Sequence, residues 1–307
     1  MKKCVIIYNP NSGKKLRKDF LANFVDLLLE HEYVPEVLFS RYKGHITKMV
    51  RELDAVDLVI SVGGDGTFNE AMTGNLQREK RNLLAHIPVG TTNDVGVMFG
   101  YGKDIIKNIK MLLDGVEKEI DICTINGRPF VYVAGFGKFM NVPYETSRNL
   151  KKRYGHMAYL MEGAKEFTNK TRLYDITYEV DGEVYNGLYS FGIISNATRV
   201  AGIKDFVKDV KLDDNKFEVL LCNITAKKDI VKSLYYLTTS DITKVPGFYF
   251  HKVSSMKIKF NDKNVKKNWC IDGEKLEEDS DEFEIKVVRN IKLLIPKKNI
   301  DNLFVEK

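Results

Sequence analysis

One short stretch constrains this chain more than any other. The apolar run Leu58-Val59-Ile60 leads into a turn that holds three glycines within four positions, Gly63, Gly64 and Gly66. Glycine lets a backbone turn tightly and come close to a bulky anion. Asp65 lies among these glycines, and a carboxylate repels a phosphate unless a cation bridges the two. The stretch therefore predicts a nucleotide and Mg²⁺ at this turn.

The first 120 residues alternate apolar runs with helical spacing. The expected strands are short, nearly continuous apolar runs, at residues 4–8, 36–40, 57–62 and 83–89. The expected helices have apolar residues at helical spacing and begin near Leu16, Ile46, Thr67 and Ile105. Thr67 is a suitable cap for the third helix. This order predicts an open, mostly parallel sheet with helices on both faces, which is a three-layer α/β/α domain.

The pattern changes near residue 119. From there to about residue 289 the expected strands are short, and turn pairs separate them at Asn126-Gly127, Asp181-Gly182 and Asp272-Gly273. Such spacing is typical of antiparallel sheets, so we expect a C-terminal β-sandwich domain with helices over 148–169 and 226–240. We predict an α/β domain over 1–122 and a β-rich domain over 123–290. The sequence leaves open whether 291–307 completes the first domain.

Composition narrows the class of protein. No apolar stretch reaches the roughly 18 residues that a membrane-spanning helix needs. The N-terminal apolar run is too short for a signal peptide, which favours the first strand of a cytoplasmic protein. The four cysteines are far apart, so we expect reduced, partly buried thiols and neither a zinc site nor a disulfide framework.

Charge gives a weaker indication. The net charge of +6 is too mild to indicate a nucleic-acid partner. Lysines recur in the second half of the chain, at Lys252, Lys257, Lys259, Lys263, Lys266 and Lys267. They fit either a weakly basic face for an anionic membrane surface or an ordinary solvated face.

Two more polar turns follow expected strands. Residues 9–13 read Asn-Pro-Asn-Ser-Gly after the first strand, and 90–94 read Gly-Thr-Thr-Asn-Asp after the fourth. Neither turn has the spacing of a Walker loop, and 9–13 alone would more often be a helix N-cap turn. Parallel strands bring their carboxyl ends to one sheet edge. Three polar turns at that edge predict one binding site.

Taken together, these motifs resemble the diacylglycerol kinase family of lipid kinases, and most closely its soluble bacterial branch. In the second half, residues 134–137, 195–197, 211–215 and 272–274 are similar to that family's landmarks and follow in its order. The first two N-terminal motifs are shared with NAD kinases and 6-phosphofructokinase-like folds. The Gly-Thr-Thr-Asn-Asp turn and the late Asp-Gly-Glu triplet are more specific to lipid kinases.

The resemblance implies a role for each matching position. ATP would contact Asn9, Ser40, Gly63, Gly64, Asp65, Gly66, Thr67, Phe68, Asn69 and Thr91. Asp65 and Glu274 would be catalytic, with Glu274 taking the proton of a lipid hydroxyl. Metal positions would be Lys211, Asp214 and Lys216 for a structural Mg²⁺, the lysines through their carbonyls, with Asp94 and Asp121 in the metal and water network.

Two features complicate the match. Asp-Gly-Glu occurs twice, at 181–183 and 272–274, and either triplet fits a plain hairpin turn. We assign the base to the later one because the family places it there. The chain also departs from the family at Val95-Gly96, where Phe-Ala is usual, at Asn215, where glycine is usual, and at Lys216, where a hydrophobic residue is common.

We therefore expect an ATP- and Mg²⁺-dependent kinase that phosphorylates a lipid at a membrane surface and associates with that surface reversibly. The alternatives are an NAD kinase, a lipid kinase that prefers a sphingosine-like acceptor, and a non-catalytic nucleotide or lipid-binding module. The presence of Asp65, Asp94 and Glu274 together argues against the last. The lipid and the oligomeric state stay open, a homodimer being one alternative.

Overall fold

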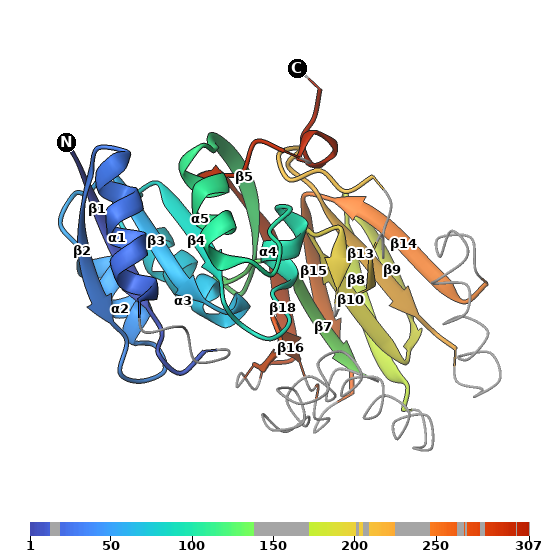
Figure 1. Cartoon of the computed structure of the whole chain (residues 1–307). Coiled ribbons are helices and arrows are strands. Elements are labelled where there is room, and N and C mark those ends of the chain that lie inside the picture. The colour runs from blue at the N-terminus through green and yellow to red at the C-terminus, as the bar shows by residue number, and fades with distance from the viewer. Residues whose placement is uncertain are drawn as a thin grey trace. The chain divides into compact units, whose positions relative to one another are not determined.

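The computed structural model describes residues 1–12, 19–137, 172–200, 203–204, 209–224, 246–262, 267, 269–276, 280–298 and 300–306 (Figure 1). The chain divides into two compact units. The N-terminal unit comprises Met1–Ile120 and Arg289–Lys307, and the β-rich unit comprises Asp121–Val288. The helices expected over 148–169 and 226–240 lie outside the described residues, and so does Gly13.

The N-terminal unit contains the predicted parallel sheet. Its strands are β1 (Lys2–Tyr8), β2 (Tyr33–Phe39), β3 (Leu58–Gly63) and β4 (Leu84–Pro88), in the order β2-β1-β3-β4. All three pairings are parallel. Every residue of β3 and β4 is buried, as the continuous apolar runs predict for strands covered on both faces.

Helices cover both faces of this sheet. They are α1 (Phe20–Glu30), α2 (His45–Glu52), α3 (Asp65–Leu76), α4 (Asp94–Met98) and α5 (Ile105–Leu113), and the short 3₁₀ helix η2 (Asp301–Leu303) follows the last strand. Helix α1 packs beside α5, and α2 packs beside α3 (Figure 1). Right-handed crossovers from this strand order place α1 on one face and α2 with α3 on the other. The predicted α/β/α layering is confirmed.

The long strand β18 (Glu282–Ile295) ends in the N-terminal unit. Its residue Leu293 pairs in parallel with Leu84 of β4. Residues 289–307 group with the N-terminal unit, so the last apolar stretch extends its parallel sheet. Strand β5 (Val116–Ile125) likewise starts in that unit and ends in the other.

The β-rich unit is built from antiparallel strands. In chain order they are β6 (Arg128–Phe130), β7 (Val133–Gly137), β8 (Tyr174–Val180), β9 (Glu183–Tyr189), β10 (Phe191–Ser195), β11 (Arg199–Val200), β12 (Ile203–Lys204), β13 (Phe217–Cys222), β14 (Phe248–Val253), β15 (Ser255–Phe260), β16 (Cys270–Ile271) and β17 (Glu274–Lys275). One sheet has the order β14-β13-β10-β7-β16-β17. The first half of β18 pairs with β15, which continues through β8 to β9.

Side chains from both of these sheet regions form one apolar core. Phe136 of β7 and Phe217 of β13 belong to the same cluster as Tyr178 of β8 and Phe260 of β15. Trp269 completes an aromatic group with Phe136, their ring centroids 5.1 Å apart. A core shared by two sheet faces is the arrangement of a sandwich, so the predicted β-sandwich is confirmed.

The three predicted turn pairs all form tight hairpin turns. At Asn126-Gly127, Asp181-Gly182 and Asp272-Gly273, both residues of the pair have positive φ. Two successive left-handed residues define the turn that matches the twist of antiparallel strands. The four cysteines are free and buried, as expected. Within the described residues, no helix combines the length and apolar character needed to cross a membrane.

Candidate functional site

The first polar turn joins β3 to α3. Helix α3 begins at Asp65 and Gly64 is its N-cap residue, without a side-chain capping bond. The expectation that Thr67 caps this helix is therefore wrong, because the helix starts two residues earlier than its apolar spacing indicates. The Thr67 hydroxyl instead accepts a hydrogen bond of 3.0 Å from the side-chain amide of Asn9.

This contact connects the turn between β3 and α3, called the α3 turn below, to the turn at 9–12. Asn9 follows β1, and its backbone N–H donates to the carbonyl of Val62 over 3.0 Å. Its side-chain oxygen accepts the backbone N–H of Asn11, and its carbonyl accepts the hydroxyl of Ser12. Asn9 is thus fixed on three sides and holds Thr67 in the α3 turn.

Asp65 connects the α3 turn to the third turn, at 90–94, which follows β4. Its two carboxylate oxygens accept the backbone N–H groups of Asp94 and Val95, each over 3.1 Å. These N–H groups are at the start of α4, where a negative charge is favourable. Asp65 therefore has a structural role here, besides the binding role that the resemblance implies. The structural requirement depends on residues 29 and 30 positions away.

The α3 turn and the third turn also approach each other through their backbones. Val89 N–H donates to the carbonyl of Gly63 over 2.7 Å. A Cβ atom added to Gly90 would lie 2.6 Å from the Cα atom of Gly64, a distance that real Cβ atoms do not reach. A Cβ atom added to Gly66 would meet nothing within 4 Å. The three-turn site, meaning the turns at 9–12, 63–67 and 90–94, is thus tightly packed at Gly90 and open at Gly66.

A buried polar pair packs against α3 next to this turn, and no sequence motif indicated it. Ser61 and His86 are register neighbours on β3 and β4, and the Ser61 hydroxyl lies 2.9 Å from Nδ1 of His86. The ring of His86 lies against Phe68 of α3, with centroids 5.0 Å apart. Burial lowers the pKa of His86 to about 3, so its ring is neutral. The available signal was one polar residue within each of two apolar strands.

Three more predicted nucleotide contacts lie in the N-terminal unit. Ser40 is buried just after β2, and its N–H donates to the carbonyl of Tyr8. Asn69 lies on α3, where its carbonyl accepts the hydroxyl of Thr73. Thr91 is exposed in the third turn. Glu70, which no prediction included, accepts the N–H of Ile46 and so fixes the start of α2 against α3.

The predicted base lies in the β-rich unit on a hairpin that a buried carboxylate holds. Asp272 accepts the backbone N–H groups of Val131, Tyr132 and Val133 at 2.7, 3.2 and 3.1 Å. Its own N–H donates to the carbonyl of Val133. Glu274 is the first residue after this turn, and its carboxylate is partly exposed. The structure thus anchors the hairpin through Asp272 and leaves Glu274 accessible.

The other Asp-Gly-Glu triplet differs in this respect. Asp181, Gly182 and Glu183 form the turn between β8 and β9, and all three are exposed. Identical residues therefore occupy two hairpins with different environments. The assignment of the base to Glu274 stays a prediction.

Two sequence landmarks of the β-rich unit, 195–197 and 211–215, meet around Asp121. The side chain of Asp121 accepts the backbone N–H of Asn215 over 2.6 Å, and its N–H donates to the carbonyl of Leu212. The side-chain amide of Asn196 donates to the carbonyl of Asp121. Asn215 has a φ of 59°, which asparagine tolerates in place of glycine. Asp121 thus shapes the loop that carries the predicted metal positions.

A lysine forms ion pairs with Asp214 of this loop and with Glu218 of β13. Lys252 Nζ lies 2.8 Å from Oδ2 of Asp214 and 3.4 Å from Oε1 of Glu218, and it donates to the carbonyl of Asp209. The other oxygen of Asp214 accepts the N–H of Lys216. Burial raises the pKa of Glu218 to about 7, against the opposing effect of the lysine. Lys252 thus takes a place beside Asp214 in this structure, and the metal role of Lys211, Asp214 and Lys216 stays a prediction.

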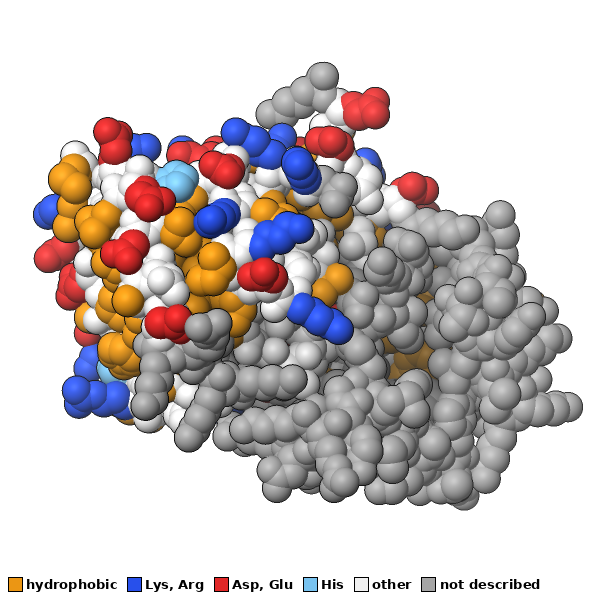
Figure 2. Space-filling model, in the orientation of Figure 1, with side chains coloured by type: hydrophobic (Ala, Val, Ile, Leu, Met, Phe, Trp, Pro, Cys, Tyr) orange, Lys and Arg blue, Asp and Glu red, His pale blue; other side chains and the backbone are white. Residues whose placement is uncertain are grey.

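The lysines that suggested a basic face are largely paired with carboxylates. The pairs within the described residues are Lys252 with Asp214 and Glu218, Lys257 with Glu179, Lys259 with Glu282, and Lys267 with Asp281. Lys263 and Lys266 lie outside the described residues. This pairing favours an ordinary solvated face. In Figure 2 the coloured surface belongs mostly to the N-terminal unit, where basic and acidic side chains are interspersed with hydrophobic ones.

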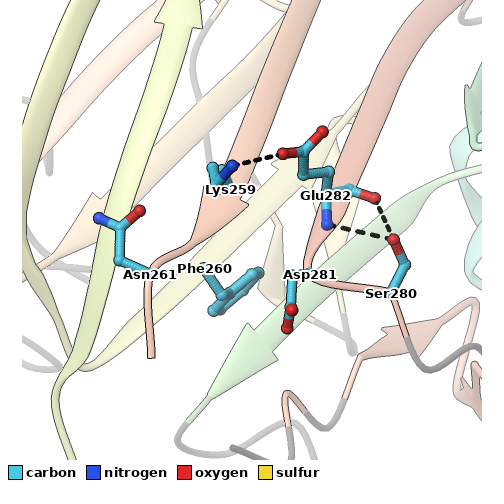
Figure 3. A pocket seen from close by; sticks show the side chains of 6 residues that line it. All are labelled: Lys259, Phe260, Asn261, Ser280, Asp281 and Glu282. Atoms are coloured by element: carbon cyan, nitrogen blue, oxygen red, sulfur yellow. Dashed lines mark hydrogen bonds and ion pairs between the residues drawn. The ribbon is translucent and has the colours of Figure 1, made fainter. Parts of the chain in front are cut away.

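A shallow hollow in the β-rich unit is lined by Lys259, Phe260, Asn261, Ser280, Asp281 and Glu282 (Figure 3). The polar groups in it already have hydrogen-bond or ion-pair partners. Lys259 pairs with the Glu282 carboxylate over 2.6 Å, and the Ser280 hydroxyl donates to the Glu282 carbonyl. The hollow contains none of the predicted site residues. Among the described residues, no group of three or more His, Cys, Asp or Glu side chains is arranged to hold a metal ion.

Comparison with known proteins gives this site its family. The diacylglycerol kinase catalytic domain family matches residues 3–125. A diacylglycerol kinase from Bacillus subtilis (strain 168) is 28% identical over 306 residues, which cover 99% of each chain. A diacylglycerol kinase from Staphylococcus epidermidis (strain RP62A) is 31% identical over 276 residues, covering 89% of this chain and 86% of that one.

The fold agrees with a solved structure. The crystal structure of a diacylglycerol kinase from Bacillus anthracis str. Sterne has a TM-score of 0.75 at 22% identity, covering 96% of this chain and 97% of that one. At this identity the likeness shows the fold alone. Fold and sequence define a kinase of the lipid kinase class. The chain belongs to the diacylglycerol kinase family.

Proposed function

We propose that this chain is an ATP-dependent lipid kinase that transfers the γ-phosphoryl group of ATP to a hydroxyl of diacylglycerol or a related lipid. The observation that carries the proposal is the three-turn site, in which Asp65 holds two turns together while Gly66 stays open. Relatives named diacylglycerol kinase support a lipid acceptor.

The open side of the α3 turn suits a triphosphate. Helix α3 begins at Asp65, and the N–H groups of a helix N-terminus favour phosphate. The absence of a side chain at Gly66 lets an anion approach the backbone there. Catalysis of phosphoryl transfer rests mainly on positioning and charge neutralisation. Rigid turns contribute to the positioning.

Asp65 and Asp94 would hold Mg²⁺. A carboxylate has about four acceptor positions, and the N–H groups of Asp94 and Val95 take two of those on Asp65. Because Asp65 is only partly buried, it fits a cation bound directly or through water. When bound, Mg²⁺ would neutralise charge on the phosphate oxygens.

Glu274 would accept the proton of the lipid hydroxyl. The hydroxyl oxygen then forms a bond to the γ-phosphorus, the bond to the β,γ-bridging oxygen breaks, and ADP leaves. The proton remains on the Glu274 carboxylate until solvent removes it. Asp272 contributes by fixing the hairpin, since a positioned base is effective only within hydrogen-bond reach.

Transfer of radiolabelled phosphate from ATP to dispersed diacylglycerol tests this proposal. We expect labelled phosphatidic acid with the wild-type chain. In Glu274→Gln we expect turnover to fall by about 100-fold or more. ATP binding should persist in that variant. Glu183→Gln, in the exposed Asp-Gly-Glu hairpin, is the matched control and should keep full activity.

Label appearing in NADP when NAD is supplied, with none in lipid, would overturn the lipid assignment in favour of an NAD kinase. ATP binding without transfer to any acceptor would indicate a non-catalytic module. Full activity of Glu274→Gln would remove Glu274 from the mechanism.

A lipid acceptor also requires contact with a membrane surface. We propose reversible association, driven by the substrate more than by lysines, because Lys252, Lys257, Lys259 and Lys267 are each paired with a carboxylate. Sedimentation with vesicles containing diacylglycerol should exceed sedimentation with otherwise identical vesicles lacking it. Equal sedimentation with both would contradict this proposal.

A further inference from the structure

An arginine lies beside the proposed base. Arg128 Nη2 is 3.7 Å from Oε2 of Glu274, and the two side chains are 36% and 43% exposed. Arg128 begins β6, directly after the Asn126-Gly127 turn. No prediction from the sequence included Arg128, because it lies far from Glu274 along the chain.

The backbone at Arg128 is fixed from both sides. On one side Asn126 is bound to β18: its N–H donates to the Glu284 carbonyl over 2.9 Å, and its side-chain oxygen accepts the Glu284 N–H over 2.8 Å. On the other side Phe130 is buried in the core. The segment around Arg128 therefore has little freedom to move away.

The same carboxylate fixes both partners of the ion pair. Asp272 immediately precedes the Gly273-Glu274 step, and it binds three N–H groups within 131–133, directly after β6. The hairpin that carries Glu274 and the strand that carries Arg128 are thus tied at one point. The guanidinium and the proposed base thus lie 3.7 Å apart on two anchored segments.

Such a pair contributes little to folding. Exposed ion pairs typically stabilise a protein by about 0–1 kcal/mol. Its position matters more for chemistry, because the proposed reaction brings a triphosphate close to an ionised glutamate, and like charges repel. A guanidinium also presents several donors in one plane, which orients a carboxylate better than an ammonium does.

We propose that Arg128 is a positioning residue for Glu274. Its guanidinium orients the carboxylate toward the lipid hydroxyl and offsets its charge as the γ-phosphate arrives. This inference rests on the proposed function and adds a residue to it.

A double-mutant cycle tests the proposal on the full chain with radiolabelled ATP and diacylglycerol. We expect Arg128→Gln to lower kcat by on the order of 10-fold to 100-fold, since small misplacement of a catalytic group has such effects. KM for ATP and the melting temperature should stay near wild-type values. Arg128→Lys should recover part of kcat, and in a Glu274→Gln background Arg128→Gln should change turnover less than twofold.

The control is Lys259→Gln, which removes an exposed ion pair with Glu282 in the same unit and should leave kcat unchanged. Equal fold-losses from Arg128→Gln in both backgrounds would overturn the proposal, and so would wild-type kcat in Arg128→Gln. In those cases a large effect of Glu274→Gln alone would leave the proposed function standing. A wild-type chain that labels no lipid would overturn both.

Discussion

A Cβ atom on Gly90 would lie 2.6 Å from the Cα atom of Gly64, so these two turns meet backbone against backbone. Gly90→Ala must therefore push the third turn away from the α3 turn. We expect a loss of about 1–3 kcal/mol in the free energy of unfolding, as for other overpacked sites. Thermal and urea unfolding would measure it, together with nucleotide affinity, which should fall because the three-turn site is distorted.

Gly66→Ala is the matched control for that change. A methyl group there meets nothing within 4 Å and lies within α3, so the melting temperature should stay the same or rise slightly. ATP affinity should nevertheless fall if the phosphates approach the backbone at Gly66. Unchanged ATP affinity in Gly66→Ala would place the phosphates elsewhere.

The two Asp-Gly-Glu hairpins give a second prediction. Asp272→Asn replaces a carboxylate that accepts three N–H groups with an amide whose NH₂ faces donors. We expect a loss of about 1–3 kcal/mol in the free energy of unfolding, together with lower kinase activity, because Glu274 loses its anchor. Asp181→Asn, on the exposed hairpin, should change stability by no more than about 0.5 kcal/mol. Similar losses in the two variants would show that burial of Asp272 has no special role.

Much of the fold was predictable because local signals and the global structure agree. The apolar run at Leu58-Val59-Ile60 predicts a strand covered on both faces, and β3 is buried throughout. The pair Asp181-Gly182 predicts a turn with positive φ, and both residues adopt it. Both signals depend only on neighbouring residues in the chain, so the sequence alone is enough to predict the strand and the turn.

The site was less predictable because its contacts join distant segments. The triplet Asp-Gly-Glu itself does not distinguish Asp272 from Asp181, since burial is decided by the strand that packs across it. Lys252 pairs with Glu218 because β14 and β13 place them opposite each other, and register is a property of the folded sheet. The structural role of Asp65 is not visible in the sequence for a related reason: its carboxylate accepts N–H groups at the start of α4, which follows another strand.

His86 gives a prediction for pH dependence. Burial lowers the pKa of the folded His86 to about 3, compared with 6.5 for an unperturbed histidine. Between these values the unfolded chain binds a proton that the folded chain does not, so the free energy of unfolding falls as the pH drops from 6.5 toward 3. The stabilisation is fully present above pH 6.5.

Urea unfolding at several pH values between 4 and 7.5 would measure this effect. His86→Gln should show a shallower decline than the wild type, since carboxylates contribute equally to both curves. Ser61→Ala removes the hydroxyl beside Nδ1 but keeps the titrating ring, so its decline should stay steep. Parallel curves for His86→Gln and the wild type would contradict the prediction.

The last prediction concerns the cation of the Asp214 loop. Lys252→Met removes the ammonium from Glu218, which is 2% exposed, and from Asp214. Leaving a buried carboxylate without its partner should cost about 1–3 kcal/mol in the free energy of unfolding. Because the Asp214 and Glu218 carboxylates and the Asp209 carbonyl then no longer surround an ammonium, Mg²⁺ or Ca²⁺ should raise the melting temperature of the variant more than that of the wild type.

Lys257→Met is the control, because its pair with Glu179 is exposed and spans 3.9 Å; we expect a change of less than about 1 kcal/mol and no added response to metal. Differential scanning calorimetry with EDTA and with millimolar Mg²⁺ would compare the three proteins. If EDTA lowers the melting temperature of the wild type as much as Lys252→Met does, a divalent ion already occupies this loop beside the lysine. That result would support the metal role that the family resemblance implies for Lys211, Asp214 and Lys216.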